Sequence, residues 1–94
     1  MREAISQLED VRQRLVQAID AIDDPQTAFD AASEVREILR KTHDEIAELR
    51  TRAVGEIWER DKLSLSKLAD RIGVSKARAD EIIRTVKRRK ASDV

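Results

Sequence analysis

The chain has 94 residues, of which 40% are charged and 40% apolar, with two glycines, one proline and two aromatic residues, a composition typical of long surface helices. Its net charge is zero. The sequence has no cysteine and one histidine, which excludes disulfides, thiolate metal sites and multi-histidine metal centres. No apolar run approaches the roughly twenty residues of a membrane span, and the N-terminus has no apolar signal region, so we expect a cytoplasmic protein without a membrane partner.

The first predicted helix covers about residues 1–22. Apolar residues recur at alternating spacings of three and four from Met1 to Ile22, which is typical of an amphipathic helix. The pattern stops at Asp23. Asp24 can then cap a second helix, and Pro25 suits its first position because no amide donor is needed there. This short turn predicts an antiparallel, coiled-coil-like helical hairpin.

The second predicted helix runs from Pro25 to about Arg60, and it contains no other proline or glycine before Gly55. Its apolar seam, which includes Ala28 and Ala32, indicates continuation into a partner chain, so we expect a homodimer. The alternative is a monomeric hairpin whose two stripes cover each other, although that would leave several apolar residues poorly covered. The expected dimer seam consists of Leu8, Val11, Leu15, Ile22, Phe29, Val35, Ile38, Leu39, Ile46 and Leu49.

Two short helices joined by a tight turn are predicted after residue 63. Ser64 caps the first, and Gly73 ends it because a glycine adopts a left-handed backbone angle at little steric cost. Ser75 caps the second. Helices around such a short turn cross steeply and need small residues at the contact, which Ala69 and Ala79 supply. The inward residues are predicted to be Leu65, Leu68, Ala69, Ile72 and Val74, followed by Ala79, Ile82, Ile83 and Val86.

The end of the long helix completes this core with Val54, Ile57 and Trp58. Trp58 could instead bind a base or a ligand, but core packing is the favoured interpretation. Gly55 permits either a close helix approach or a bend, and the sequence leaves both open.

This stretch resembles the helix-turn-helix superfamily, and most nearly the variety found in region 4 of bacterial sigma factors and in small phage or plasmid regulators. The resemblance covers about the last 45 residues and implies an all-α fold in which the long helix runs into a tri-helical DNA-binding domain. The resemblance does not extend to residues 1–50, where the apolar seams predict an oligomerisation domain formed by the helical hairpin. We expect a helix-turn-helix domain at 51–90 and a frayed tail at 91–94. The matching residues are Leu65, Leu68, Ala69, Ile72, Gly73, Val74, Ala79 and Ile82.

The resemblance places the last helix, at 76–89, in the major groove of double-stranded DNA. Lys76 suits guanine acceptors, Ala77 a thymine methyl group, and Glu81 the N4 amino group of cytosine. The predicted base-facing residues are Ser75, Lys76, Ala77, Glu81 and Arg84. The predicted phosphate contacts are Ser64, Ser66, Lys67, Arg78, Lys87, Arg88, Arg89 and Lys90.

The distribution of charge along the chain indicates that the C-terminal half, residues 51–94, binds an anionic partner. Residues 1–50 hold 7 Lys and Arg against 12 Asp and Glu, a net of −5, whereas residues 51–94 hold 12 against 7, a net of +5. The alternative for the run 87–90 is a solvated helix end that complements the helix dipole. Asp80 and Glu81 would oppose phosphates unless they read bases or form i,i+4 pairs, such as Asp80 with Arg84.

The leading hypothesis is a nucleoid-associated, homodimeric transcriptional regulator, activator or repressor, that binds DNA in a sequence-specific way. A second hypothesis is a protein-interaction module that binds a sigma factor or RNA polymerase through the hairpin. A third is a DNA packaging or partition protein. An enzyme is disfavoured, because the sequence has no glycine-rich phosphate loop, metal cluster or nucleophile–base pair, and His43 lies in mid-helix. No cofactor is expected.

Overall fold

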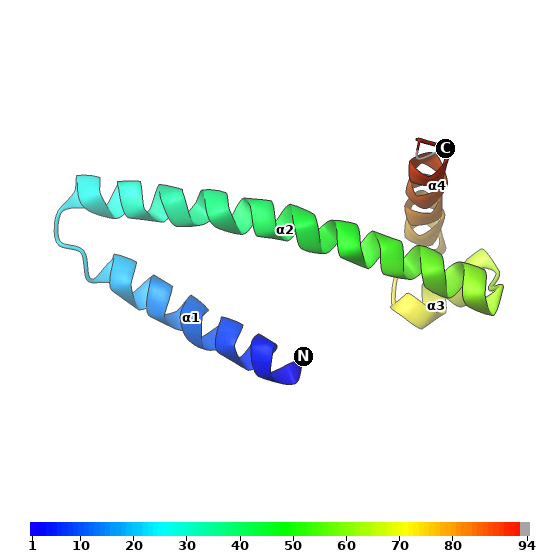
Figure 1. The fold of residues 1–94 in the computed structure, drawn as a ribbon, viewed down its shortest axis with the longest axis horizontal. Helices are drawn as coiled ribbons and strands as arrows, with labels where there is room; N and C mark the ends of the chain where they lie inside the picture. The colour runs from blue at the N-terminus through cyan, green and yellow to red at the C-terminus, as the bar shows by residue number, and fades with distance from the viewer. Residues whose placement is uncertain (93–94) are drawn as a thin grey trace. The chain divides into compact units, whose positions relative to one another are not determined.

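A computed structural model describes residues 1–92, which form four α-helices without a strand in that range (Figure 1). The helices are α1 (Arg2–Asp20), α2 (Pro25–Asp61), α3 (Leu65–Ile72) and α4 (Lys76–Ser92). The predicted all-α fold class is therefore confirmed. Within the described part of the chain, no helix is both long enough and apolar enough to cross a membrane.

Helix α4 extends further than the sequence predicts. Ala91 and Ser92 belong to α4, and the Ser92 hydroxyl donates a hydrogen bond of 3.1 Å to the carbonyl of Arg88. Neither a proline nor a glycine stops the helix before this point, so it continues beyond the expected end. The remainder of the predicted tail, 93–94, lies outside the described residues.

The chain divides into two compact units, Met1–Lys41 and Thr42–Val94, and the division falls within α2. The expected domain boundary at 50/51 is nine residues further along than this division. Residues before 51 already interact with α4. Glu48, for example, forms an ion pair of 2.7 Å with Arg89.

In unit 1 (1–41), α1 and the first part of α2 run in opposite directions from a turn at 21–24 (Figure 1). The Asp24 carboxylate accepts hydrogen bonds from the Thr27 amide, at 2.9 Å, and from the Thr27 hydroxyl, at 2.7 Å. These bonds lower the pKa of Asp24, because they favour the charged carboxylate. The predicted cap and the predicted start at Pro25 are thus confirmed.

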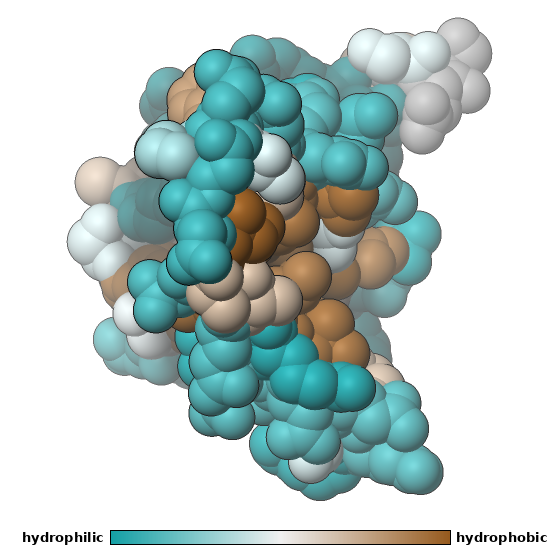
Figure 2. Space-filling model, turned by 90° about the vertical axis from the view of Figure 1, so that its left-hand side faces the viewer, coloured by the Kyte–Doolittle hydropathy of each residue, from teal (hydrophilic) through white to brown (hydrophobic). Residues whose placement is uncertain are grey.

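No side chain of unit 1 is buried. Half-buried positions occur on both sides of the turn: Leu15, Ile19, Ile22, Ala28, Ala31 and Val35. Ala31, rather than the expected Ala32, therefore lies on the inner stripe of α2, because the spacing 28, 31, 35 follows the helical repeat. Leu8, Val11, Phe29, Ile38 and Leu39 remain exposed. Apolar surface is correspondingly visible among hydrophilic side chains in Figure 2.

Unit 2 (42–94) contains the hydrophobic core. The buried cluster consists of Leu68 and Ala69 of α3 with Ala79 and Ile83 of α4, and α3 packs directly on α4. Both alanines predicted for the steep crossing are buried, and Val54, Ile57 and Trp58 of α2 pack against the cluster as expected. Gly55 permits a close approach of α2 to α4, since an added Cβ would lie 2.8 Å from Cγ1 of Val86.

Helices α2 and α3 end in the same way, with a residue in the left-handed backbone conformation. Gly73 adopts φ 74° after α3, and the amide of Val74 donates to the carbonyl of Ala69 at 3.0 Å, as in a Schellman motif. After α2, Lys62 adopts φ 49°, and the amide of Leu63 donates to the carbonyl of Trp58 at 3.4 Å. The apolar residue after each left-handed residue packs against the core, which fixes where the next helix starts.

Candidate nucleic-acid interface

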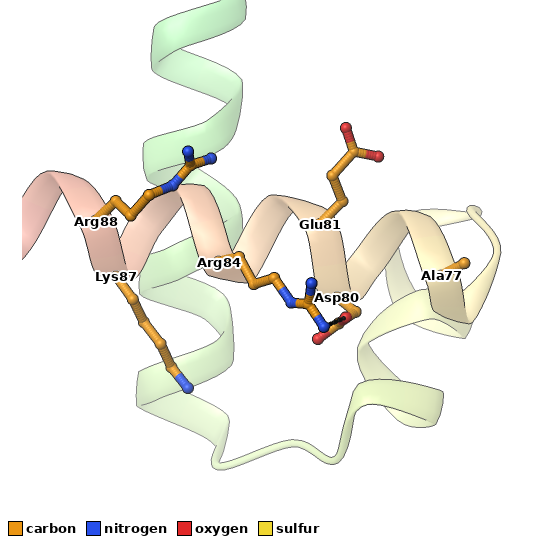
Figure 3. Close-up of a pocket in the computed structure, with 6 residues that line it drawn as sticks. All are labelled: Ala77, Asp80, Glu81, Arg84, Lys87 and Arg88. Carbon is orange, nitrogen blue, oxygen red and sulfur yellow. Dashed lines mark ion pairs between the residues drawn. The ribbon is translucent and has the colours of Figure 1, made fainter.

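The outer face of α4 forms a shallow hollow on the surface of unit 2. Six residues line it: Ala77, Asp80, Glu81, Arg84, Lys87 and Arg88 (Figure 3). Most of them recur at helical spacing on the side away from Ala79, Ile83 and Val86, which are buried, whereas Lys87 lies at the border between this face and the core. Because α4 crosses the end of α2 steeply (Figures 1 and 3), this face projects away from the packed core.

The start of α4 is fixed by its cap. The Ser75 hydroxyl accepts a hydrogen bond of 3.1 Å from the amide of Arg78, as predicted. Lys76 and Ala77 follow at once and are exposed. Of the five predicted base-facing residues, Ala77, Glu81 and Arg84 line the hollow together, whereas Ser75 and Lys76 lie at the helix start outside its lining.

The two carboxylates of this face pair with neighbouring arginines. Arg84 lies 2.9 Å from Asp80, its side chain directed along the helix toward that carboxylate (Figure 3). Arg78 lies 3.2 Å from Glu81. Both pairs lie within α4, and exposed pairs of this kind contribute little stability.

The residues predicted to contact phosphates differ in their exposure and in their partners. Ser64 caps α3 by accepting a hydrogen bond of 3.2 Å from the amide of Lys67, and both Ser66 and Lys67 are exposed. In the run 87–90, Lys87 and Arg88 line the outer hollow. Arg89 instead contacts Glu48 of α2 at 2.7 Å, and Lys90 pairs with Glu59 of α2. The structure thus separates four cations that the sequence analysis treats alike.

Helical geometry explains this separation. Lys90 follows Val86 by four residues and Ile83 by seven, so it lies on the same side of α4 as these buried residues. Glu48 and Glu59 are not among the residues that the sequence analysis selects. The position of Lys90 on the inner stripe is a signal for such a partner, but the identity of the carboxylate depends on the crossing of α4 over α2.

Trp58 supports the interface from within unit 2. It is half-buried against the core cluster, in agreement with the favoured core interpretation. The Lys87 Nζ lies 5.2 Å from the centroid of its ring, within the range of a cation–π contact. Lys87 therefore combines a position on the outer hollow with a partner in the core.

An ion-pair cluster joins the ends of α2 and α3. Arg71 lies 2.9 Å from Asp61, which also contacts Arg60 at 2.9 Å. Hydrogen bonds from Arg60 and Arg71 lower the pKa of Asp61 to about 2. The cluster helps to fix α3 against α2, and therefore the turn from which α4 starts.

Comparison of the chain with known protein families, curated proteins and solved structures finds no match. Among residues 1–92, no group of three or more potential ligands is arranged to hold a metal ion.

Proposed function

We propose that this chain is a helix-turn-helix protein that binds double-stranded DNA in a sequence-specific way and regulates transcription as a homodimer. The observation that carries the proposal is the outer face of α4, where Asp80 is half-buried and the other five residues of the hollow are exposed. The helix holds 7 Lys and Arg against 2 Asp and Glu, a net of +5. An exposed cationic helix that follows a tight turn suits the major groove.

The face combines residue types that read base edges. Arg84 and Lys76 can donate to the O6 and N7 atoms of guanine, and Ala77 can contact a thymine methyl group. Glu81 can accept from the N4 amino group of cytosine, which gives this carboxylate a role near phosphates. Ser64, Ser66, Lys67, Arg78, Lys87 and Arg88 would contact the backbone around this face.

Selection of duplexes from a random pool, followed by binding assays on the selected sequence, tests the proposal. Lys76→Ala with Arg84→Ala should relax the preference and lower the affinity, since each good base contact gives about 1–3 kcal/mol of discrimination. Arg12→Ala with Arg14→Ala is the matched control, because it removes two exposed cations from α1. If no sequence is enriched, or if both double variants bind like the wild type, DNA reading by α4 is rejected.

The homodimer is supported by the apolar residues left exposed along the expected seam. Leu8 and Phe29 of unit 1, and Ile46 and Leu49 of unit 2, are exposed. Residues of this kind are commonly covered by association. Light scattering with and without the selected DNA should give two chains per duplex, and the two half-sites should lie about 34 Å apart, or a multiple of this, as an inverted repeat.

A second function is favoured by one observation, the acidic and apolar surface of unit 1. This unit holds 6 Lys and Arg against 9 Asp and Glu, a net of −3, beside its exposed leucines. Such a surface would suit a sigma factor or RNA polymerase subunit. The full chain would then capture purified polymerase in a way that Leu8→Asp abolishes and Lys76→Ala does not. Assemblies larger than a dimer on DNA would favour packaging or partition.

A further inference from the structure

Two carboxylates of α2 hold half of the cationic run at the end of α4. The Glu48 Oε1 lies 2.7 Å from the Arg89 Nη2, and the Glu59 carboxylate pairs with the Lys90 ammonium group. Both pairs border one groove between α2 and α4, at whose floor Gly55 meets Val86. Glu48 and Glu59 lie eleven residues apart on α2, close to three helical turns, and so project from the same side of that helix.

The other half of the run forms neither of these two ion pairs, although Arg88 lies beside Glu48 in a second hollow. Lys87 and Arg88 line the outer hollow with Ala77 and Arg84 (Figure 3). Positions 88, 84, 81 and 77 follow the i, i+3 and i+4 spacing of a single helix face. A duplex that approaches this face meets Lys87 and Arg88 first. To reach it, Arg89 and Lys90 would have to leave Glu48 and Glu59.

Competition for these two cations has a direct electrostatic consequence. A cation that neutralises a phosphate releases a counterion, and each such contact adds about 0.9 to the slope of log affinity against log salt. A cation already neutralised by a carboxylate of its own chain does not add this contribution. In addition, each carboxylate repels phosphates within a Debye length, about 8 Å at physiological ionic strength.

We propose that Glu48 and Glu59 are positioning residues that withhold Arg89 and Lys90 from DNA, so that only Lys87 and Arg88 of this run contact phosphates. This inference rests on the proposed DNA binding of α4 and defines which side of the helix end the backbone follows. It also makes the affinity for DNA of any sequence weaker and less salt-dependent than the charge of the run predicts.

The first test compares two double variants within the run, with a fluorescently labelled mixed-sequence duplex as the probe. Lys87→Ala with Arg88→Ala should flatten the salt slope by about 1.8, the contribution of two phosphate contacts. Arg89→Ala with Lys90→Ala should leave the slope within error of the wild type. Equal flattening by both double variants would overturn the inference.

The second test releases the two withheld cations. Glu48→Gln with Glu59→Gln should steepen the slope by about 1.8, and affinity should then fall about threefold more per freed cation between about 50 and 200 mM salt. Glu34→Gln with Glu45→Gln is the charge-matched control, because both carboxylates are exposed on α2 and lie outside the lining of the groove. Adding Arg89→Ala and Lys90→Ala to the released variant should abolish the gain.

These outcomes separate the inference from the proposed function. If Lys87→Ala with Arg88→Ala flattens the slope but the released variant matches its charge-matched control, α4 binds DNA and the inference is wrong. A purely structural role for the two pairs predicts this result, together with a lower melting temperature. If the wild type does not bind the duplex at all, both the proposed function and the inference fail.

Discussion

Unit 1 and unit 2 use similar numbers of aliphatic residues in opposite ways. In unit 2, three helical segments enclose Leu68, Ala69, Ala79 and Ile83, and additional side chains of α2 pack around them. In unit 1, two helices meet only along half-buried positions near their turn, and Leu8 and Phe29 are 62% and 67% exposed.

This difference indicates which part of the chain is stabilised by its own packing. Isolated helices are marginal in water, and most helical stability in proteins comes from packing of an amphipathic face. Unit 2 provides that packing internally. Unit 1 offers apolar stripes without a buried centre, so its stability depends on whatever covers the stripes.

The same substitution in each unit should have very different effects. Leu68→Ala removes a side chain that is 0% exposed, and we expect a loss of about 2–5 kcal/mol in the free energy of unfolding. Leu8→Ala should change it by no more than about 0.5 kcal/mol in dilute solution. Denaturation followed by circular dichroism measures both. Comparable losses would show that unit 1 has a core of its own.

The contact between α2 and α4 can be broken from the side of the glycine. Gly55→Ala places a methyl group 2.8 Å from Val86 Cγ1, so the Val86 side chain or one of the two helices must shift, and we expect a loss of about 1–3 kcal/mol despite the better helix propensity of alanine. Adding Val86→Ala removes the clash. The double variant should therefore be more stable than the sum of the single losses predicts, and additive losses would contradict the close packing.

The two left-handed helix ends give a smaller, paired effect. Gly73→Ala should lower the free energy of unfolding by about 1–2 kcal/mol, because an alanine is strained at φ 74° even where nothing lies within 4 Å. Lys62→Gly should raise it by up to about 1 kcal/mol, because it relieves the strain at φ 49°. Thermal unfolding of both variants gives the two signs, and a change of the same sign in both would refute the shared motif.

The smallest effect concerns pH. The pKa of Asp61 is lowered from 3.8 to about 2, so its ion pairs stabilise the fold fully above about pH 4, and this contribution is lost as the pH falls through about 2. Wild type should lose slightly more stability on acidification over this range than Asp61→Asn does. Asp70→Asn, which removes an exposed carboxylate of α3, is the control. The expected difference in stability is small because the ion pairs of Asp61 are exposed to solvent.

Local signals predicted most of the fold. Asp24, Ser64 and Ser75 were identified as caps from residue type and position, and each accepts the expected backbone hydrogen bond. Gly73 was identified as a helix end for the same kind of reason. These features depend on a few neighbouring residues, so the sequence contains all the information they require.

Features that depend on packing were not predicted. Lys62 ends α2 with a positive φ although lysine carries no signal for it, because the packing of Leu63 against the core fixes the chain direction there. The partners of Arg89 and Lys90 were missed, since Glu48 and Glu59 come within reach only through the crossing of α4 over α2. Helical periodicity predicts which residues lie on the outer face of α4. It does not predict which cations of α4 form ion pairs with α2, because these pairs depend on how the two helices cross.

The contact of Lys87 with Trp58 has a practical consequence for spectroscopy. Trp58 is the single tryptophan and the sequence has no tyrosine, so the near-ultraviolet emission of the protein comes from one indole in unit 2. An ammonium group held 5.2 Å from that ring makes its brightness and wavelength sensitive to where the lysine goes. The intrinsic fluorescence of Trp58 can therefore report, without any label, on ligand binding at the exposed side of α4.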